Sequence, residues 1–143
     1  TFVAAFSAVN ESTWEHLKLV FYPTFIFSII EYFFIGKSTN NYSIAKTIAI
    51  IFEMSFITIF FYTYTGIIGT NYAFLDISSF VVAIIAGEYI AYKIMLKPQI
   101  RNNAIKILAI IIPILLLIAF VVATYNPPMI NLFKDPVTGG YGI

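Results

Sequence analysis

Long apolar runs alternate with short polar breaks along the chain. Four runs are almost continuously apolar, at residues 13–35, 44–64, 73–96 and 104–125. A helix of about 20 residues spans the roughly 30 Å hydrocarbon core of a bilayer. The runs lack the period-two alternation that is typical of barrel strands. The pattern therefore predicts an all-α integral membrane bundle of four transmembrane helices, forming one domain over residues 1–143.

Glycine and proline positions indicate where these helices end or bend. Gly66 and Gly69 follow the second run, and either can supply the left-handed residue that closes a helix. Pro113 lies inside the fourth run, where it is expected to kink the helix and to free the carbonyl of Ala109. A Pro-Pro pair then ends this run, and we expect the tail that follows to dock as a cap.

The composition indicates that the apolar runs lie in a membrane and do not form the core of a soluble domain. Hydrophobic residues make up 60% of the chain and charged residues only 10%, against about 25% charged in a soluble domain. The mean hydropathy is +0.90. A net charge of +1 excludes a nucleic-acid binder built on a basic face. The lack of cysteine excludes disulfides, thiolate metal sites and cysteine nucleophiles.

Basic residues predict the orientation. Six of the eight Lys and Arg residues lie beside the first and third breaks, and the positive-inside rule places both breaks in the cytoplasm. Residue 1, the second break and the tail at 126–143 are then outside. The six residues are Lys37, Lys46, Lys93, Lys97, Arg101 and Lys106.

A polar cluster opens the first run on the predicted outer side. Ser12 and Glu15 have the spacing of a capping box, which explains both without any function. His16 is the only histidine, and with Glu11 and Glu15 it is a candidate for a divalent metal, although no second histidine accompanies it. Polar groups from several segments are expected to line an outer vestibule. Its predicted members are Asn10, Glu11, Trp14, Glu15, His16, Tyr64 and Asp76.

Three carboxylates lie inside the predicted spans, at Glu31, Glu53 and Glu88. A charge at the centre of a helix costs about 2.5–3.5 kcal/mol on insertion scales, so each needs a partner or a purpose. Glu53 is the deepest, and no Lys or Arg is expected at the depth of Glu53. Proton carriers or cation ligands would have this placement. The alternative is that each carboxylate joins helices by hydrogen bonds, with partners such as Ser55, Thr58 and Thr63.

Several polar motifs interrupt the apolar runs, namely N-E-S-T-W-E-H-L-K, Y-T-Y-T-G and D-P-V-T-G-G-Y-G, together with Pro23 and the pair Glu31-Tyr32. In these motifs the chain resembles an uncharacterised family of small bacterial multi-pass membrane proteins. The resemblance implies a bacterial cytoplasmic membrane and one further transmembrane helix before Thr1, giving five in all. It implies no activity and no catalytic residue.

Three functional hypotheses follow. The first is binding or translocation of a small solute or ion by Glu53, Glu88 and Glu31, which predicts that Glu53 and Glu88 face a common interior cavity and fails if their side chains point to different helix interfaces. The second is a metal-assisted hydrolase or lipid-modifying enzyme at the membrane interface, using Glu15 and His16. The third is a non-catalytic accessory subunit.

The expected partners are the lipid bilayer and a second copy of the chain, with no nucleic acid. No cofactor is expected beyond the metal of the second hypothesis.

Overall fold

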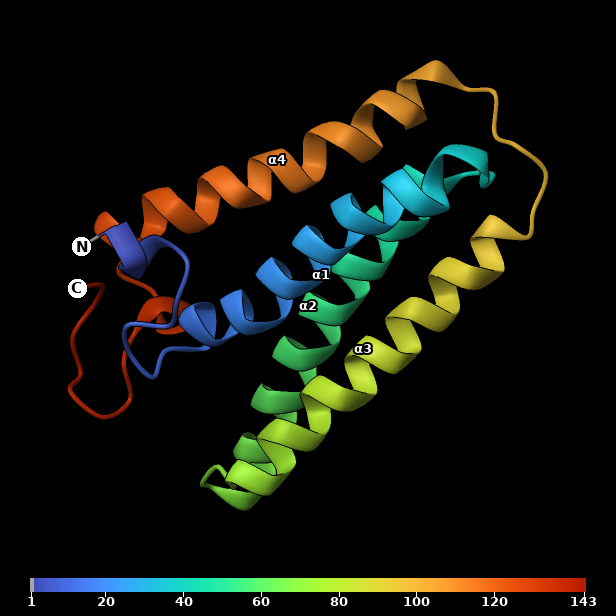
Figure 1. The fold of residues 1–143 in the computed structure, drawn as a ribbon. Coiled ribbons are helices and arrows are strands. Elements are labelled where there is room, and N and C mark those ends of the chain that lie inside the picture. The colour runs from blue at the N-terminus through green and yellow to red at the C-terminus, as the bar shows by residue number, and fades with distance from the viewer. Residues whose placement is uncertain (1) are drawn as a thin grey trace.

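The structure, a computed structural model, describes residues 2–143 and contains four long helices (Figure 1). Each is long and apolar enough to cross a membrane, so the predicted all-α bundle of four transmembrane helices is confirmed. The helices are α1 (Thr13–Phe34), α2 (Tyr42–Ile68), α3 (Ala73–Met95) and α4 (Asn103–Tyr125). Short 3₁₀ turns lie at Phe2–Ala5, Gly36–Ser38 and Asn131–Phe133.

Successive helices run in opposite directions, and α2 contacts the other three (Figure 1). The turn at Phe2–Ala5, the C-terminal tail and the α2–α3 turn lie at one end of the bundle, here called the terminal end. The α1–α2 turn and the α3–α4 loop lie at the opposite end. We call this the basic end, because these connections and the adjoining helix turns carry Lys37, Lys93, Lys97, Arg101 and Lys106.

Local signals explain where the helices begin and end. The Ser12 hydroxyl accepts a hydrogen bond from the Glu15 amide at 3.3 Å, which caps α1 as the sequence predicts. The reciprocal bond of a capping box is not made, because the Ser12 amide donates to Asn10 Oδ1 at 2.9 Å instead. Helix α2 begins before the predicted 44–64 and continues beyond it. Gly66 stays helical, and Gly69, with φ of 86°, ends the helix in the left-handed conformation.

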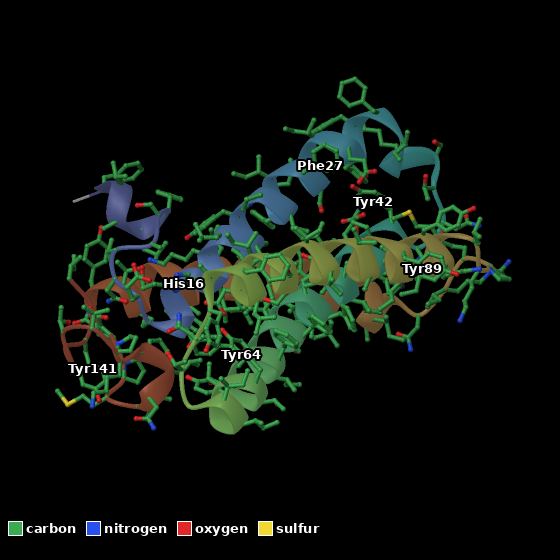
Figure 2. All side chains as sticks on the ribbon, turned by 90° about the horizontal axis from the view of Figure 1, so that it is seen from below. His16, Phe27, Tyr42, Tyr64, Tyr89 and Tyr141 are labelled. Carbon is green, nitrogen blue, oxygen red and sulfur yellow. The ribbon has the colours of Figure 1, made fainter. Side chains whose placement is uncertain are left out.

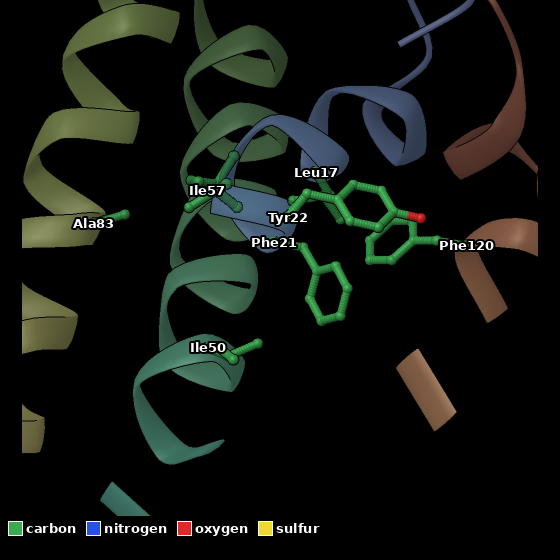
Figure 3. Close-up of a cluster of buried hydrophobic side chains, with 8 residues drawn as sticks. Leu17, Phe21, Tyr22, Ile50, Ile57, Ala83 and Phe120 are labelled. Atoms are coloured by element: carbon green, nitrogen blue, oxygen red, sulfur yellow. The ribbon is translucent and has the colours of Figure 1, made fainter. Parts of the chain in front are cut away.

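The main apolar core lies where α1, α2 and α4 meet (Figure 3). Phe21 of α1 packs against Phe120 of α4, with ring centroids 4.9 Å apart. Ile50 and Ile57 of α2 belong to the same cluster. The buried members are Leu17, Val20, Phe21, Tyr22, Ile50, Ile57, Ala83 and Phe120.

Helix α3 packs against α2 through small residues. The buried positions of α3 recur at every fourth residue and therefore form one stripe. Small side chains let two backbones approach closely, which drives helix association where lipid is as apolar as leucine. The stripe consists of Ser79, Ala83, Gly87 and Ala91.

Helix α4 continues through Pro113, which leaves the Ala109 carbonyl without its helical donor. The hydroxyl of Thr47 on α2 donates to this carbonyl. A backbone group that the sequence predicts to be free is therefore satisfied by a neighbouring helix, as an apolar environment requires.

Asn41 joins the two connections at the basic end. Its backbone is left-handed, with φ of 56°, and the residue is buried. The backbone amide donates to Gln99 Oε1 at 3.1 Å, and the side-chain amide donates to the Pro98 carbonyl at 3.0 Å. The side-chain oxygen accepts from the Ile100 amide at 2.7 Å. The α1–α2 turn and the α3–α4 loop are thus held together.

Candidate functional site

A buried lysine joins two of the three intramembrane glutamates. Lys46 Nζ of α2 lies 2.6 Å from Glu31 Oε2 of α1 and 2.6 Å from Glu88 Oε2 of α3. Only 5% of the Lys46 side chain is exposed. Glu88 therefore has a basic partner, because the long side chain of Lys46 reaches it from the second turn of α2. We call Glu31, Lys46, Glu53 and Glu88 the carboxylate cluster.

Tyr42 extends this cluster toward α1. Its hydroxyl donates to the Ser28 carbonyl at 2.7 Å and lies 3.0 Å from Glu31 Oε2. A tyrosine hydroxyl has only one proton. It can therefore donate to only one of these two oxygens at a time.

Glu53 is the most deeply buried member of the cluster. It is 1% exposed, and its Oε2 accepts from the Thr24 hydroxyl of α1 at 2.9 Å. Its Oε1 has no hydrogen-bond partner. Thr24 lies about midway along α1, so Glu53 is far from both ends of the bundle. The partners expected from its own helix are not used, because Thr58 and Thr63 donate to carbonyls of α2 itself.

On its other side, Glu53 packs against the backbone of α3 at Gly87. A Cβ atom at Gly87 would lie 2.6 Å from Glu53 Oε1 and 2.7 Å from its Cγ. Gly87 precedes Glu88 in the chain. Glu53 therefore lies against the α3 backbone one residue before Glu88, whereas the Glu88 side chain bonds Lys46.

A second buried ion pair lies at the terminal end. Lys18 Nζ donates to Glu15 Oε2 at 2.7 Å, to the Ala4 carbonyl at 2.9 Å and to the Thr124 hydroxyl at 2.5 Å. These three bonds use all three ammonium donors. Glu15 Oε2 also accepts from the Val9 amide at 3.1 Å. Glu15 therefore belongs to a structural pair that joins the first turn, α1 and α4.

Asn10 and Trp14, at the start of α1, contact the C-terminal tail. Asn10 Nδ2 donates to the Gly142 carbonyl at 3.0 Å, and the Trp14 ring centroid lies 4.8 Å from that of Phe133. Figure 2 shows His16 and Tyr141 at this end. The tail is thus docked, as expected from the sequence.

His16 is held within its own helix turn. Its Nδ1 lies 3.0 Å from the Ser12 carbonyl, and its Nε2 lies 3.4 Å from Glu11 Oε2. Over residues 2–143, no three His, Asp or Glu side chains are grouped closely enough to hold a metal ion. The ligand grouping that the enzyme hypothesis needs is not found in this part of the chain.

Tyr64 and Asp76 form a separate pair where α2 turns into α3. The Tyr64 hydroxyl donates to Asp76, and Asn71 Nδ2 donates to the same carboxylate at 3.2 Å. Figure 2 shows Tyr64 on α2, apart from His16 on α1. The residues predicted to line one outer vestibule thus form two groups, one around α1 and the tail and the other at the α2–α3 turn.

Part of the carboxylate cluster could have been found from the sequence. Tyr42, Lys46 and Glu53 are four and seven residues apart, so they fall on one face of α2. Thr24 and Gly87 carry no such signal, because their roles depend on how α1 and α3 pack against α2.

The docked tail is expected to respond to acid through Asp135. The Thr138 hydroxyl, the Val137 amide and, across the docking contact, the Glu11 backbone amide donate to its carboxylate, which lowers the pKa of Asp135 below its usual value. A lowered carboxyl pKa stabilises the docked tail at full strength above about pH 4, and this contribution is lost as the pH falls through the folded-state pKa.

Fluorescence of Trp14, the single tryptophan, measures this response because the ring contacts Phe133 of the tail. We expect constant emission from pH 7 to about pH 4 and a change below it. Asp135→Asn is expected to show altered emission already at pH 7. An unchanged acid transition in this variant would contradict the assignment.

These helices and their buried charges define a multi-pass membrane protein with a carboxylate cluster inside its bundle. The chain belongs to a family of unknown function, DUF6512, whose model matches residues 1–143. This membership fits the resemblance to an uncharacterised membrane protein family. No curated protein and no solved structure matches the chain.

Proposed function

We propose that the protein translocates a small ion across the membrane, with Glu53 as the group that carries it through the bundle. The observation that supports this proposal is the Glu53 carboxylate itself, buried far from both ends with one oxygen unpartnered. Ionisable residues inside membrane spans are costly and characteristically mark ion or proton pathways. In this proposal the basic end is cytoplasmic, in a bacterial cytoplasmic membrane.

The charges of the carboxylate cluster support the binding of cations. The cluster has three carboxylates and one ammonium group. Fully ionised, it would have a net charge of −2, which is unfavourable away from water. Two bound protons or monovalent cations would make it neutral. The cluster is therefore built to take up and release positive charge.

The basic end offers the route by which an ion reaches Glu53. The side chains of Glu31 and Glu88 are 22% and 38% exposed on the bundle surface, and in this proposal they exchange ions with the solution at the basic end. Glu53 lies seven residues beyond Lys46, about 10 Å further along the helix axis. On the other side of Glu53, the apolar core around Ile57 and Phe120 closes the path to the terminal end. Transport requires a second conformation in which this core opens.

Proteoliposomes test the proposal directly. The protein is reconstituted with a pH-sensitive dye inside, and a potassium diffusion potential drives protons inward. We expect the wild type to acidify the lumen faster than protein-free vesicles, and Glu53→Gln to reduce the rate to background. Glu11→Gln is the control, because Glu11 is an exposed acid at the terminal end. Equal rates for the wild type and Glu53→Gln would contradict the proposal.

A further inference from the structure

Resting on this proposed function, we infer that the Glu53 site binds a proton and excludes metal cations, and that Gly87 determines this specificity. The site offers fewer oxygen ligands than a divalent metal cation requires. Apart from the two Glu53 oxygens, the hydrogen bonds of the site bring in one oxygen, that of Thr24. Calcium takes six to eight oxygen ligands and magnesium six.

The backbone around Glu53 offers no substitute for these missing ligands. Sodium sites in transporters use carbonyls from unwound stretches of helix. Helices α1, α2 and α3 are continuous beside Glu53, so their carbonyls are engaged in helical hydrogen bonds. The exception that Pro23 makes in α1 is the carbonyl of Leu19, a residue that is exposed on the bundle surface. The Thr24 carbonyl in addition accepts from the Ser28 hydroxyl at 2.7 Å.

The space beside Glu53 is also too small for a metal cation. The α3 backbone at Gly87 approaches Glu53 so closely that even one added methyl group would overlap with Oε1, at 2.6 Å. A cation and its ligands need more room than a methyl group, whereas a proton adds almost no volume. The lone pair of Oε1 forms an O–H bond, and a hydronium ion at the basic end becomes water. The buried carboxylate thereby becomes neutral without a counter-ion.

The charged groups that face Glu53 come from three helices. Lys46 lies on the same helix, Glu88 comes from α3, and Glu31 from α1 is bound to Lys46. The charged residue of α4 is Lys106, in its first turn and far from the depth of Glu53. Proton uptake at Glu53 is therefore coupled to the charges on Glu88 and Lys46, and its titration is expected to be broad.

Infrared difference spectroscopy of the protein in lipid nanodiscs measures the proton on Glu53. We expect the carbonyl band of a protonated carboxylic acid to grow as the pH falls, and Glu53→Gln to lack it. Raising sodium, potassium or calcium at constant ionic strength is expected to leave its midpoint unchanged. A competing cation would lower the midpoint by about one pH unit for each tenfold rise in concentration, and that result would overturn the inference while leaving ion translocation intact.

The same experiment also identifies the case in which Glu53 binds no proton at all. If no band that depends on Glu53 changes at any pH, Glu53 does not exchange protons. That result would contradict this inference. If metal cations are also shown not to bind, the proposed function is contradicted as well. Binding of sodium, potassium or calcium alone, measured by calorimetry on the same nanodiscs, separates the two cases.

Two glycines provide a matched pair of variants for the role of Gly87. Gly87→Ala is expected to displace the Glu53 side chain and to move the midpoint by at least one pH unit. Gly66→Ala is the control, because Gly66 is also helical and a Cβ there meets nothing within 4 Å. Gly87→Ala alone risks loss of folding. In the double variant Glu53→Asp with Gly87→Ala, the shorter acidic side chain leaves space for the added methyl group. We expect this variant to show a carboxylic acid band that titrates. An unchanged midpoint in a folded Gly87→Ala variant would overturn the role of Gly87.

Discussion

Replacing Lys18 by methionine is expected to lower the free energy of unfolding by about 3–5 kcal/mol. The side chains of Lys18 and Glu15 are 0% and 3% exposed, so removing the ammonium leaves an unpaired carboxylate in the core. The Ala4 carbonyl and the Thr124 hydroxyl lose their donor in the same step. This lysine holds together three parts of the terminal end, which explains the size of the effect.

Unfolding of the detergent-solubilised protein by SDS, followed by helix content, measures this loss. Lys134→Met is the control, because Lys134 is exposed on the tail. Combining Glu15→Gln with Lys18→Met removes both charges and is expected to recover much of the stability. A loss below about 1 kcal/mol in the single variant would show that the pair is not buried as described.

Replacing Glu31 and Glu88 together is expected to cost far more than the two single replacements added. After Glu31→Gln or Glu88→Gln, Lys46 still has one carboxylate partner, and we expect each single loss to be below about 1 kcal/mol. In the double variant the ammonium, 5% exposed, has no ion-pair partner left. We expect a loss of roughly 2–4 kcal/mol, since a buried charge without a partner is strongly destabilising.

The same SDS titration gives the coupling between the two sites as a double-mutant cycle. The third variant that completes the argument is Lys46→Met with both glutamates replaced by glutamine, which is expected to recover stability because no charge remains buried. Additive effects of the two glutamate replacements would contradict a shared lysine.

Patterns along the chain were sufficient for the fold but not for the site. Continuous apolar runs predicted four spanning helices, because each helix in a bilayer satisfies its own backbone. The capping of α1 by Ser12 was also predictable, since it depends on residues three positions apart. The extension of α2 through Gly66 was missed, because a glycine with open space around it does not have to end a helix.

Contacts between helices explain what the sequence left open. The sequence places Lys46 among the charges that flank the first break, and only the packing of α1 and α3 on α2 shows that it joins Glu31 and Glu88. Glu53 was singled out correctly as deeply buried, but its contacts with Thr24 and Gly87 join residues far apart in the chain. Depth follows from position within one helix, whereas partners depend on how several helices rotate and cross.

A pH jump on a solid-supported membrane tests the central claim, that Glu53 takes up an ion from the basic end, most directly. Proton movement between solution and Glu53 crosses part of the membrane, so it displaces charge without a full transport cycle. We predict a transient current for the wild type and for Glu11→Gln, and none for Glu53→Gln. A current of equal size in folded Glu53→Gln would contradict the claim.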